Sequence, residues 1–180
     1  DKYIVSECVK VLRDELPYNL HIFVNSVEFI AKVIDTLKLA PEAVKVVCST
    51  SGESRQENQR KLGNAYPIGQ PSDPAKKINF YTSTCFEGCD IFDPDGVTFI
   101  VSDGRKAHTL LDISTLFTQI CGRIRDSRYK AQIVHVYSTT KYSKAVTLDE
   151  FVAATQRTLA DAESYAAEIK SLSEETRVKT

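Results

Sequence analysis

The sequence contains no methionine and no apolar run as long as a membrane span. A spanning helix needs about 20 consecutive, mostly apolar residues. No charged segment followed by an apolar one marks a signal peptide near the start. Because the chain begins at Asp1 and has no methionine, we expect a fragment of a longer intracellular, cytoplasmic protein that has no membrane partner.

An excess of charge of either sign is also absent. The chain has 23 Lys and Arg residues against 24 Asp and Glu residues, a formal net charge of −1. This balance argues against a protein that coats nucleic acid by bulk charge. A few local contacts to phosphates remain compatible with it, because such contacts need only a few residues.

The cysteines give no disulfide or zinc pattern. There are five, an odd number at irregular positions, which indicates reduced thiols in an intracellular protein. Cys85 and Cys89 could chelate a metal, but no second pair of ligands follows them. Structural zinc sites usually have four ligands, so we predict no metal site.

Short apolar runs alternate with helical spacing of apolar residues, in 180 residues that suffice for a sizeable core. The runs predict strands at 20–24, 44–48, 78–81, 97–101 and 131–137. The helical spacing predicts helices at 2–16, 27–39, 55–62 and 110–124. This alternation is typical of an α/β fold, a parallel sheet with helices on both faces. Ligands bind such sheets beyond the carboxyl ends of the strands.

A long C-terminal helix is expected after this domain. Thr147-Leu148-Asp149-Glu150 reads as a capping box, which we favour over a D-E-x-x metal motif. One face of the helix is apolar and could belong to the core or dock another domain: Leu148, Phe151, Val152, Leu159, Ala162, Ala166 and Ile169. We therefore divide the chain into a domain at 1–146 and a helical extension with a polar tail at 147–180.

Two motifs carry the chemistry. The segment 82–91 reads Thr-Ser-Thr-Cys-Phe-Glu-Gly-Cys-Asp-Ile, and it puts hydroxyls, a glycine and a carboxylate on a turn that leaves a strand. The segment 119–125 reads Gln-Ile-Cys-Gly-Arg-Ile-Arg and puts two guanidinium groups beside the end of a predicted helix. Their spacings, T-x5-G-x-D and Q-x2-G-R, resemble motifs V and VI of superfamily 2 helicases. The segment 22–26, Ile-Phe-Val-Asn-Ser, looks like the weaker motif IV.

This resemblance implies the second, C-terminal RecA-like (P-loop NTPase-like) motor domain of an ATP-dependent helicase or translocase. The sequence has no G-x4-G-K-[ST] phosphate loop. An N-terminal RecA-like domain would therefore bind most of the ATP and Mg²⁺, and we expect this fragment alone to be inactive. The E-G-x-D form that begins at Glu87 slightly favours DNA over RNA as the partner.

The resemblance also implies roles for single residues. Arg123 matches the catalytic arginine finger, whose guanidinium can span two oxygens of the transferred phosphate. The second arginine of the family pattern is replaced by Asp126, so Arg125 or Arg128 would have to act in its place. Gly88, Asp90 and Gln119 would lie near the nucleotide.

Contact with the nucleic-acid backbone would come from the hydroxyls and amides at strand ends, since such contacts need no base preference. The residues concerned are Asn25, Ser26, Thr82, Ser83 and Thr84. Alternatives remain open at this point: the hydroxyls could cap the turn, Asp90 could be an ordinary turn acid, and Arg123 could form a surface ion pair. The rival class is a degenerate RecA-like domain that serves as a scaffold or protein-interaction module.

Overall fold

The computed structural model describes residues 2–138, 146–157, 159–161, 163 and 164. These residues fall in two compact units, within Asp1–Thr139 and Thr140–Thr180. In the described residues, no helix has the length and apolarity needed to cross a membrane.

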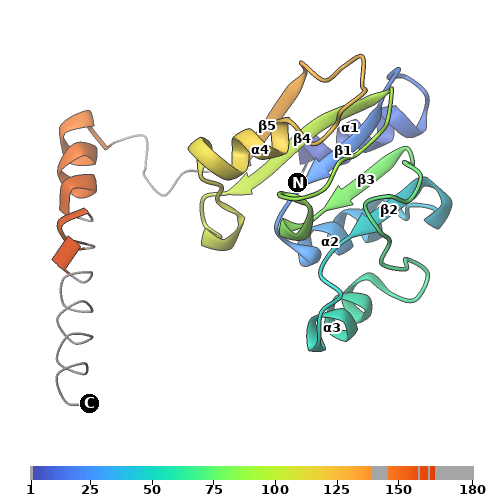
Figure 1. The fold of residues 1–180 in the computed structure, drawn as a ribbon, viewed down its shortest axis with the longest axis horizontal. Helices are drawn as coiled ribbons and strands as arrows, with labels where there is room; N and C mark the ends of the chain where they lie inside the picture. Colours follow the sequence, from blue (N-terminus) through green and yellow to red (C-terminus); the bar gives the residue numbers. More distant parts are fainter. Residues whose placement is uncertain (1, 139–145, 158, 162, 165–180) are drawn as a thin grey trace. The chain divides into compact units, whose positions relative to one another are not determined.

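The first unit is built on a five-stranded, fully parallel sheet with the strand order β2-β3-β1-β4-β5 (Figure 1). Its strands are β1 (Asn19–Phe23), β2 (Val44–Val47), β3 (Ile78–Tyr81), β4 (Gly96–Asp103) and β5 (Ile133–Ser138). Residues of β1, β2, β3 and most of β4 are buried, which is why they read as continuous apolar runs. The α/β parallel-sheet prediction is confirmed, and the arrangement is consistent with a RecA-like fold.

Besides the strands, the described residues of the first unit form four α-helices and several shorter turns. The α-helices are α1 (Lys2–Leu12), α2 (Val27–Leu37), α3 (Glu53–Leu62) and α4 (Thr118–Cys121). The shorter pieces are the 3-10 turns η1 (Pro41–Ala43), η2 (Ser83–Cys85) and η3 (Ala107–Thr109), and the π-helical turn η4 (Ile113–Phe117).

The sheet has a separate apolar core on each face. On one face α1 and α2 pack against side chains such as Ile22, Phe80 and Phe99. On the other face α4 and the segment 85–91 pack against Phe23, Tyr81 and neighbouring residues. Both cores include residues at the carboxyl edge of the sheet, Val24 and Val101 on the first face and Val47 and Tyr81 on the second.

The helix predicted at 110–124 is shorter in the structure. It runs over 113–121, as η4 followed without a break by α4, and the residues before it form η3 and an extended Leu110. The carboxylate of Asp112 accepts a hydrogen bond from Thr115 N at 2.9 Å and caps the turn that follows. A residue that satisfies a following amide in this way starts a helix rather than continuing one. The helix predicted to reach residue 16 likewise ends at Leu12.

The second unit contains a helix whose described residues begin at 148. Its capping box is present: Thr147 N donates to Glu150 Oε2 at 2.8 Å, and Glu150 N donates to Thr147 Oγ1 at 3.3 Å. Leu148, Phe151, Val152 and Leu159 are exposed. Ala162, Ala166 and Ile169, which we predicted on the same face, lie outside the described residues.

Candidate functional site

The turn after β3 places three hydroxyl side chains at the carboxyl edge of the sheet. Thr82 is buried, and its amide donates to Val47 O at 3.0 Å, so the neighbouring strand fixes its position. Its hydroxyl lies 3.3 Å from that of Thr84. Ser83 and Thr84 are exposed. The predicted phosphate-contacting residues therefore present two accessible hydroxyls on a firmly held turn.

Asn25, at the end of β1, joins this turn to the loop after β4. Its Oδ1 accepts from Ser83 N at 3.4 Å, and its Nδ2 donates to His108 O at 2.8 Å. Ser26 has a clear local role, since its hydroxyl accepts from Phe29 N at 3.2 Å and caps α2. The structure thus brings Asn25 to the predicted hydroxyls and uses Ser26 as a helix cap.

Gly88 allows the turn to change direction. Its φ is +71°, a conformation that L side chains rarely adopt, while a Cβ there would meet nothing within 4 Å. The glycine is needed for conformation and not for close packing. Two residues later Asp90 is exposed at the rim of the turn.

The segments 82–91 and 119–125 are joined by a short parallel bridge. Ile91 N donates to Arg123 O at 2.9 Å, and Arg125 N donates to Ile91 O at 3.0 Å. Ile91 and Ile124 are both buried in the core of that face. The two motifs that the sequence singled out are therefore adjacent in space.

The side chain of Arg123 strengthens this junction. Its Nη1 donates to Cys89 O at 2.9 Å, and its Nε donates to Gln119 O at 2.9 Å. The first bond reaches across to the other motif, and the second holds the last turn of α4. A guanidinium has five N–H donors, and these bonds use two of them.

Arg125 forms an ion pair with Asp90, with Nε 2.7 Å from Oδ1. Both side chains are 49% exposed. Gln119 is exposed. Gly122 has an ordinary φ of −94°, and a Cβ there would lie 3.6 Å from Gln119 O. Neither the backbone conformation nor the packing at this position therefore requires a glycine.

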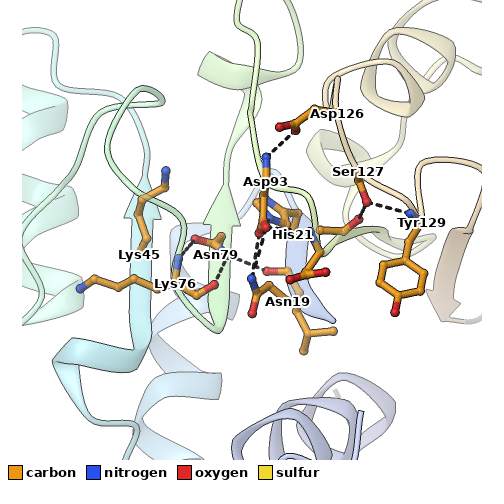
Figure 2. A network of polar contacts seen from close by, with 12 residues as sticks. Asn19, His21, Lys45, Lys76, Asn79, Asp93, Asp126, Ser127 and Tyr129 are labelled. Carbon is orange, nitrogen blue, oxygen red and sulfur yellow. Dashed lines mark hydrogen bonds and ion pairs between the residues drawn. The ribbon is translucent and has the colours of Figure 1, made fainter. Parts of the chain in front are cut away.

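Asp126, the acid at the position of the second family arginine, holds a neighbouring loop. Its Oδ1 accepts from Asp93 N at 2.8 Å (Figure 2). Asp93 in turn lies 2.8 Å from His21 Nε2 and accepts from Asn19 Nδ2 at 3.0 Å. The segment that follows Arg125 is thus tied through Asp93 to the middle of β1.

His21 is fully buried. Burial lowers its pKa, although the bond with Asp93 acts in the opposite direction. Burial raises the pKa of the Asp93 carboxyl, but hydrogen bonds from His21, Asn19 and the Asp95 amide outweigh it, and the net pKa is lowered. Gly96 allows this packing, because a Cβ there would lie 2.9 Å from the His21 ring.

No role was predicted for His21 from the sequence. The available signal was a histidine inside an apolar strand, together with the turn acids at 93 and 95. Cys85, in the turn after β3, is buried, and burial raises the pKa of its thiol to about 12. A thiol of such high pKa is a poor nucleophile at neutral pH, so Cys85 itself is not suited to nucleophilic chemistry.

Comparison of this chain with protein-family models, with curated proteins and with solved structures found no match.

Proposed function

We propose that the chain is the second motor domain of an ATP-dependent nucleic-acid helicase or translocase, located inside the cell. The main support is the bridge between Ile91 and the 123–125 segment, which sets the hydroxyl turn and both arginines on one strip of the surface. Such a strip suits a domain that must relate nucleic-acid contact to the state of a nucleotide. We call residues 82–91 and 119–125 the motif strip.

Arg123 would supply the catalytic charge. Phosphoryl transfer spreads negative charge over three equatorial oxygens, and an arginine brought in from a second domain stabilises it. An N-terminal RecA-like domain of the same protein would hold ATP and Mg²⁺. Since Cys89 O and Gln119 O accept from the Arg123 guanidinium, the strip would orient the side chain before the domains close.

The nucleic-acid contact would come from the exposed Ser83 and Thr84 hydroxyls, with Asn25 and Thr82 behind them. Contacts of this kind bind the sugar-phosphate backbone and carry no base information. We propose DNA rather than RNA as the partner, because the E-G-x-D form of the motif slightly favours DNA.

A second candidate function is a scaffold or interaction module with no motor activity. This candidate is favoured because the charged groups already make contacts within the domain: Arg123 donates to two carbonyls and Arg125 pairs with Asp90. Asp126, at the position of the second family arginine, accepts from the Asp93 amide. Side chains with such contacts could be retained for folding alone.

The deciding experiment uses the full-length protein that contains this sequence. ATP hydrolysis is measured with and without single-stranded DNA and RNA. We expect Arg123→Ala to reduce stimulated hydrolysis by on the order of 10³-fold, as for other arginine fingers, while ATP affinity stays within a few-fold. Arg123→Lys should restore little, because an ammonium cannot reproduce the planar fork.

The matched control is Arg13→Ala, an exposed arginine just after α1, which should hydrolyse ATP like wild type. Arg125→Ala and Arg128→Ala, measured in parallel, identify the second arginine. Near wild-type hydrolysis by Arg123→Ala would remove the finger assignment. A wild-type protein without any ATP hydrolysis would favour the scaffold.

A further inference from the structure

A second ligand-sized site lies at the carboxyl ends of β1, β4 and β5. It is a pocket of about 440 Å³ between these strand ends and the first residues of α1 and α2. Pockets of roughly 300–1,000 Å³ are typical of small-molecule sites, and the carboxyl edge is where parallel sheets bind ligands. None of the side chains that we assigned to hydrolysis lines it.

Five of the residues that line the pocket are apolar or aromatic. Val24, Val101 and Val136 line it, together with the rings of Phe29 and Tyr137. Tyr137 is 67% exposed, which is high for a ring of that size on a sheet. Aromatic faces of this kind stack nucleobases without regard to sequence.

The pocket also has an excess of positive charge. Four basic residues line it (Lys2, Lys32, Arg105 and Lys106) against two acidic ones, Glu28 and Asp103. Asp103 is paired with Arg105, with Nε 3.2 Å from Oδ1, and this bond and that of Ser138 lower the pKa of its carboxyl. Glu28 lies 3.7 Å from Lys106 Nζ. Each acidic lining residue thus has a basic neighbour in the lining, and the basic lining residues outnumber the acidic ones by four to two.

The loop that carries Arg105 and Lys106 is held in place before any ligand arrives. Thr109 is buried, and its hydroxyl donates toward Lys106 O at 2.8 Å and accepts from Asp103 N at 2.9 Å. The Asp103 carboxylate also accepts from the Ser138 hydroxyl at 2.7 Å, which joins this loop to β5. A pocket organised in advance loses less free energy to ordering when it binds.

We propose that this pocket binds a nucleoside phosphate, with the base against the rings and valines and the phosphate against the basic side chains. A bare anion would leave the apolar lining residues without a partner in the ligand, and an uncharged apolar ligand would make no use of the basic lining residues. Guanidinium and ammonium groups are the usual partners of phosphate oxygens. This site goes beyond the proposed motor function, since it needs no second domain.

The nucleotide has two conceivable sources with the same chemistry, a free mononucleotide or one unit of a single strand. The position of Asn25 supports the second source, a unit of a single strand. It binds His108 O beside the pocket loop and Ser83 N on the motif strip, and so lies between the two sites. A strand that crosses Asn25 would run from the strip toward the pocket.

The test titrates the 180-residue chain with AMP, adenosine and inorganic phosphate by calorimetry. We expect saturable binding of AMP that is at least about tenfold tighter than that of either part, because base and phosphate contacts add. Lys2→Glu and Lys106→Glu, both surface changes, should each weaken the affinity for AMP by about tenfold. Arg13→Glu, just past the opposite end of α1 from Lys2, should leave it unchanged. Thermal melting verifies that each variant is folded.

Absence of saturable AMP binding would overturn the proposal, as would an equal loss in Arg13→Glu. Competition by an eight-residue oligothymidine, itself weakened by Lys106→Glu, would identify a strand as the source. AMP binding that the oligomer does not displace would identify a free nucleotide. Arg123→Ala should not change AMP affinity, so a failed finger assignment and a failed pocket would be told apart.

Discussion

The two faces of the sheet are built in different ways. One is covered by α1 and α2, two continuous helices whose apolar side chains form a single core. The other is covered by short turns, a four-residue helix and loops, which carry the motif strip. On this second face, side-chain bonds to backbone atoms replace helix packing, as for Arg123 and Asp126. We call the face covered by α1 and α2 the scaffold face, because helix packing stabilises it. The shape of the other face depends on a few polar bonds.

The largest effect should come from the scaffold face. Phe99 is buried among the α1 and α2 contacts. Phe99→Ala should lower the free energy of unfolding by about 3–5 kcal/mol, because it removes buried area and leaves a cavity. Urea denaturation measures this loss. The matched control is Phe92→Ala, at a phenylalanine 67% exposed on the other side, which should cost less than about 0.5 kcal/mol. Similar losses in both would contradict the assignment of the core.

A smaller loss should follow from breaking one polar bond on the other face. Asp126→Ala leaves the Asp93 amide without its acceptor. An unsatisfied, partly buried donor costs about 1–3 kcal/mol. Asp126→Asn keeps a carboxamide oxygen and should recover most of the loss. If alanine and asparagine behave alike in urea denaturation, the bond does not hold this loop and the comparison of the two faces fails.

The Asp93–His21 pair makes the same face sensitive to acid. The pKa of His21 is lowered from its ordinary value of 6.5, so the unfolded chain binds this proton more readily than the folded one. Stability from His21 is complete above about pH 6.5 and is lost as the pH falls toward the lower folded value. The lowered pKa of Asp93 adds a further loss below its ordinary value of 3.8.

Urea denaturation at pH 7.5, 6.0 and 5.0 measures this dependence. His21→Asn should reduce the change in the free energy of unfolding between pH 7.5 and pH 5.0. The pKa of His135 is also lowered by burial, so His135→Asn is the necessary comparison, and it should retain more of the slope because that ring is more exposed. A slope unchanged in His21→Asn would show that other groups carry the acid sensitivity.

The scaffold face was the easier one to predict. Buried parallel strands are continuous apolar runs, and α1 and α2 have regular spacing, so the sequence placed these elements to within a few residues. The helix predicted at 110–124 begins later than predicted, at Ile113, because Asp112 caps it. Local spacing does not reveal such competition between side chain and backbone.

The candidate site divides in the same way. The resemblance assigned the segments 82–91 and 119–125 to one site, and the Ile91–Ile124 bridge joins the two segments directly. The contacts of Asp126 and His21 with Asp93 could not be predicted, because Asp93 lies more than thirty residues away from each of them along the chain. Only the folded sheet brings these groups within hydrogen-bond distance.

The smallest expected change in stability concerns Arg125 and Asp90. Their side chains are half exposed, and exposed ion pairs contribute about 0.2–1 kcal/mol. Arg125→Ala should therefore reduce the free energy of unfolding by less than about 1 kcal/mol, and a double-mutant cycle with Asp90→Ala should give a coupling of the same size. The pair Arg128–Asp95, also exposed, provides the comparison.

This small effect makes Arg125 a clean probe of the motif strip. A variant that folds like wild type can lose activity only through a contact that forms in the complete motor. If Arg125 acts beside Arg123, then Arg125→Ala should reduce ATP hydrolysis of the full-length protein far more than its stability loss explains, whereas Arg128→Ala should not. Equal rates of ATP hydrolysis in the two variants would show that Arg125 forms only a surface ion pair with Asp90. Arg123 would then be the one arginine of the motif strip with a proposed catalytic role.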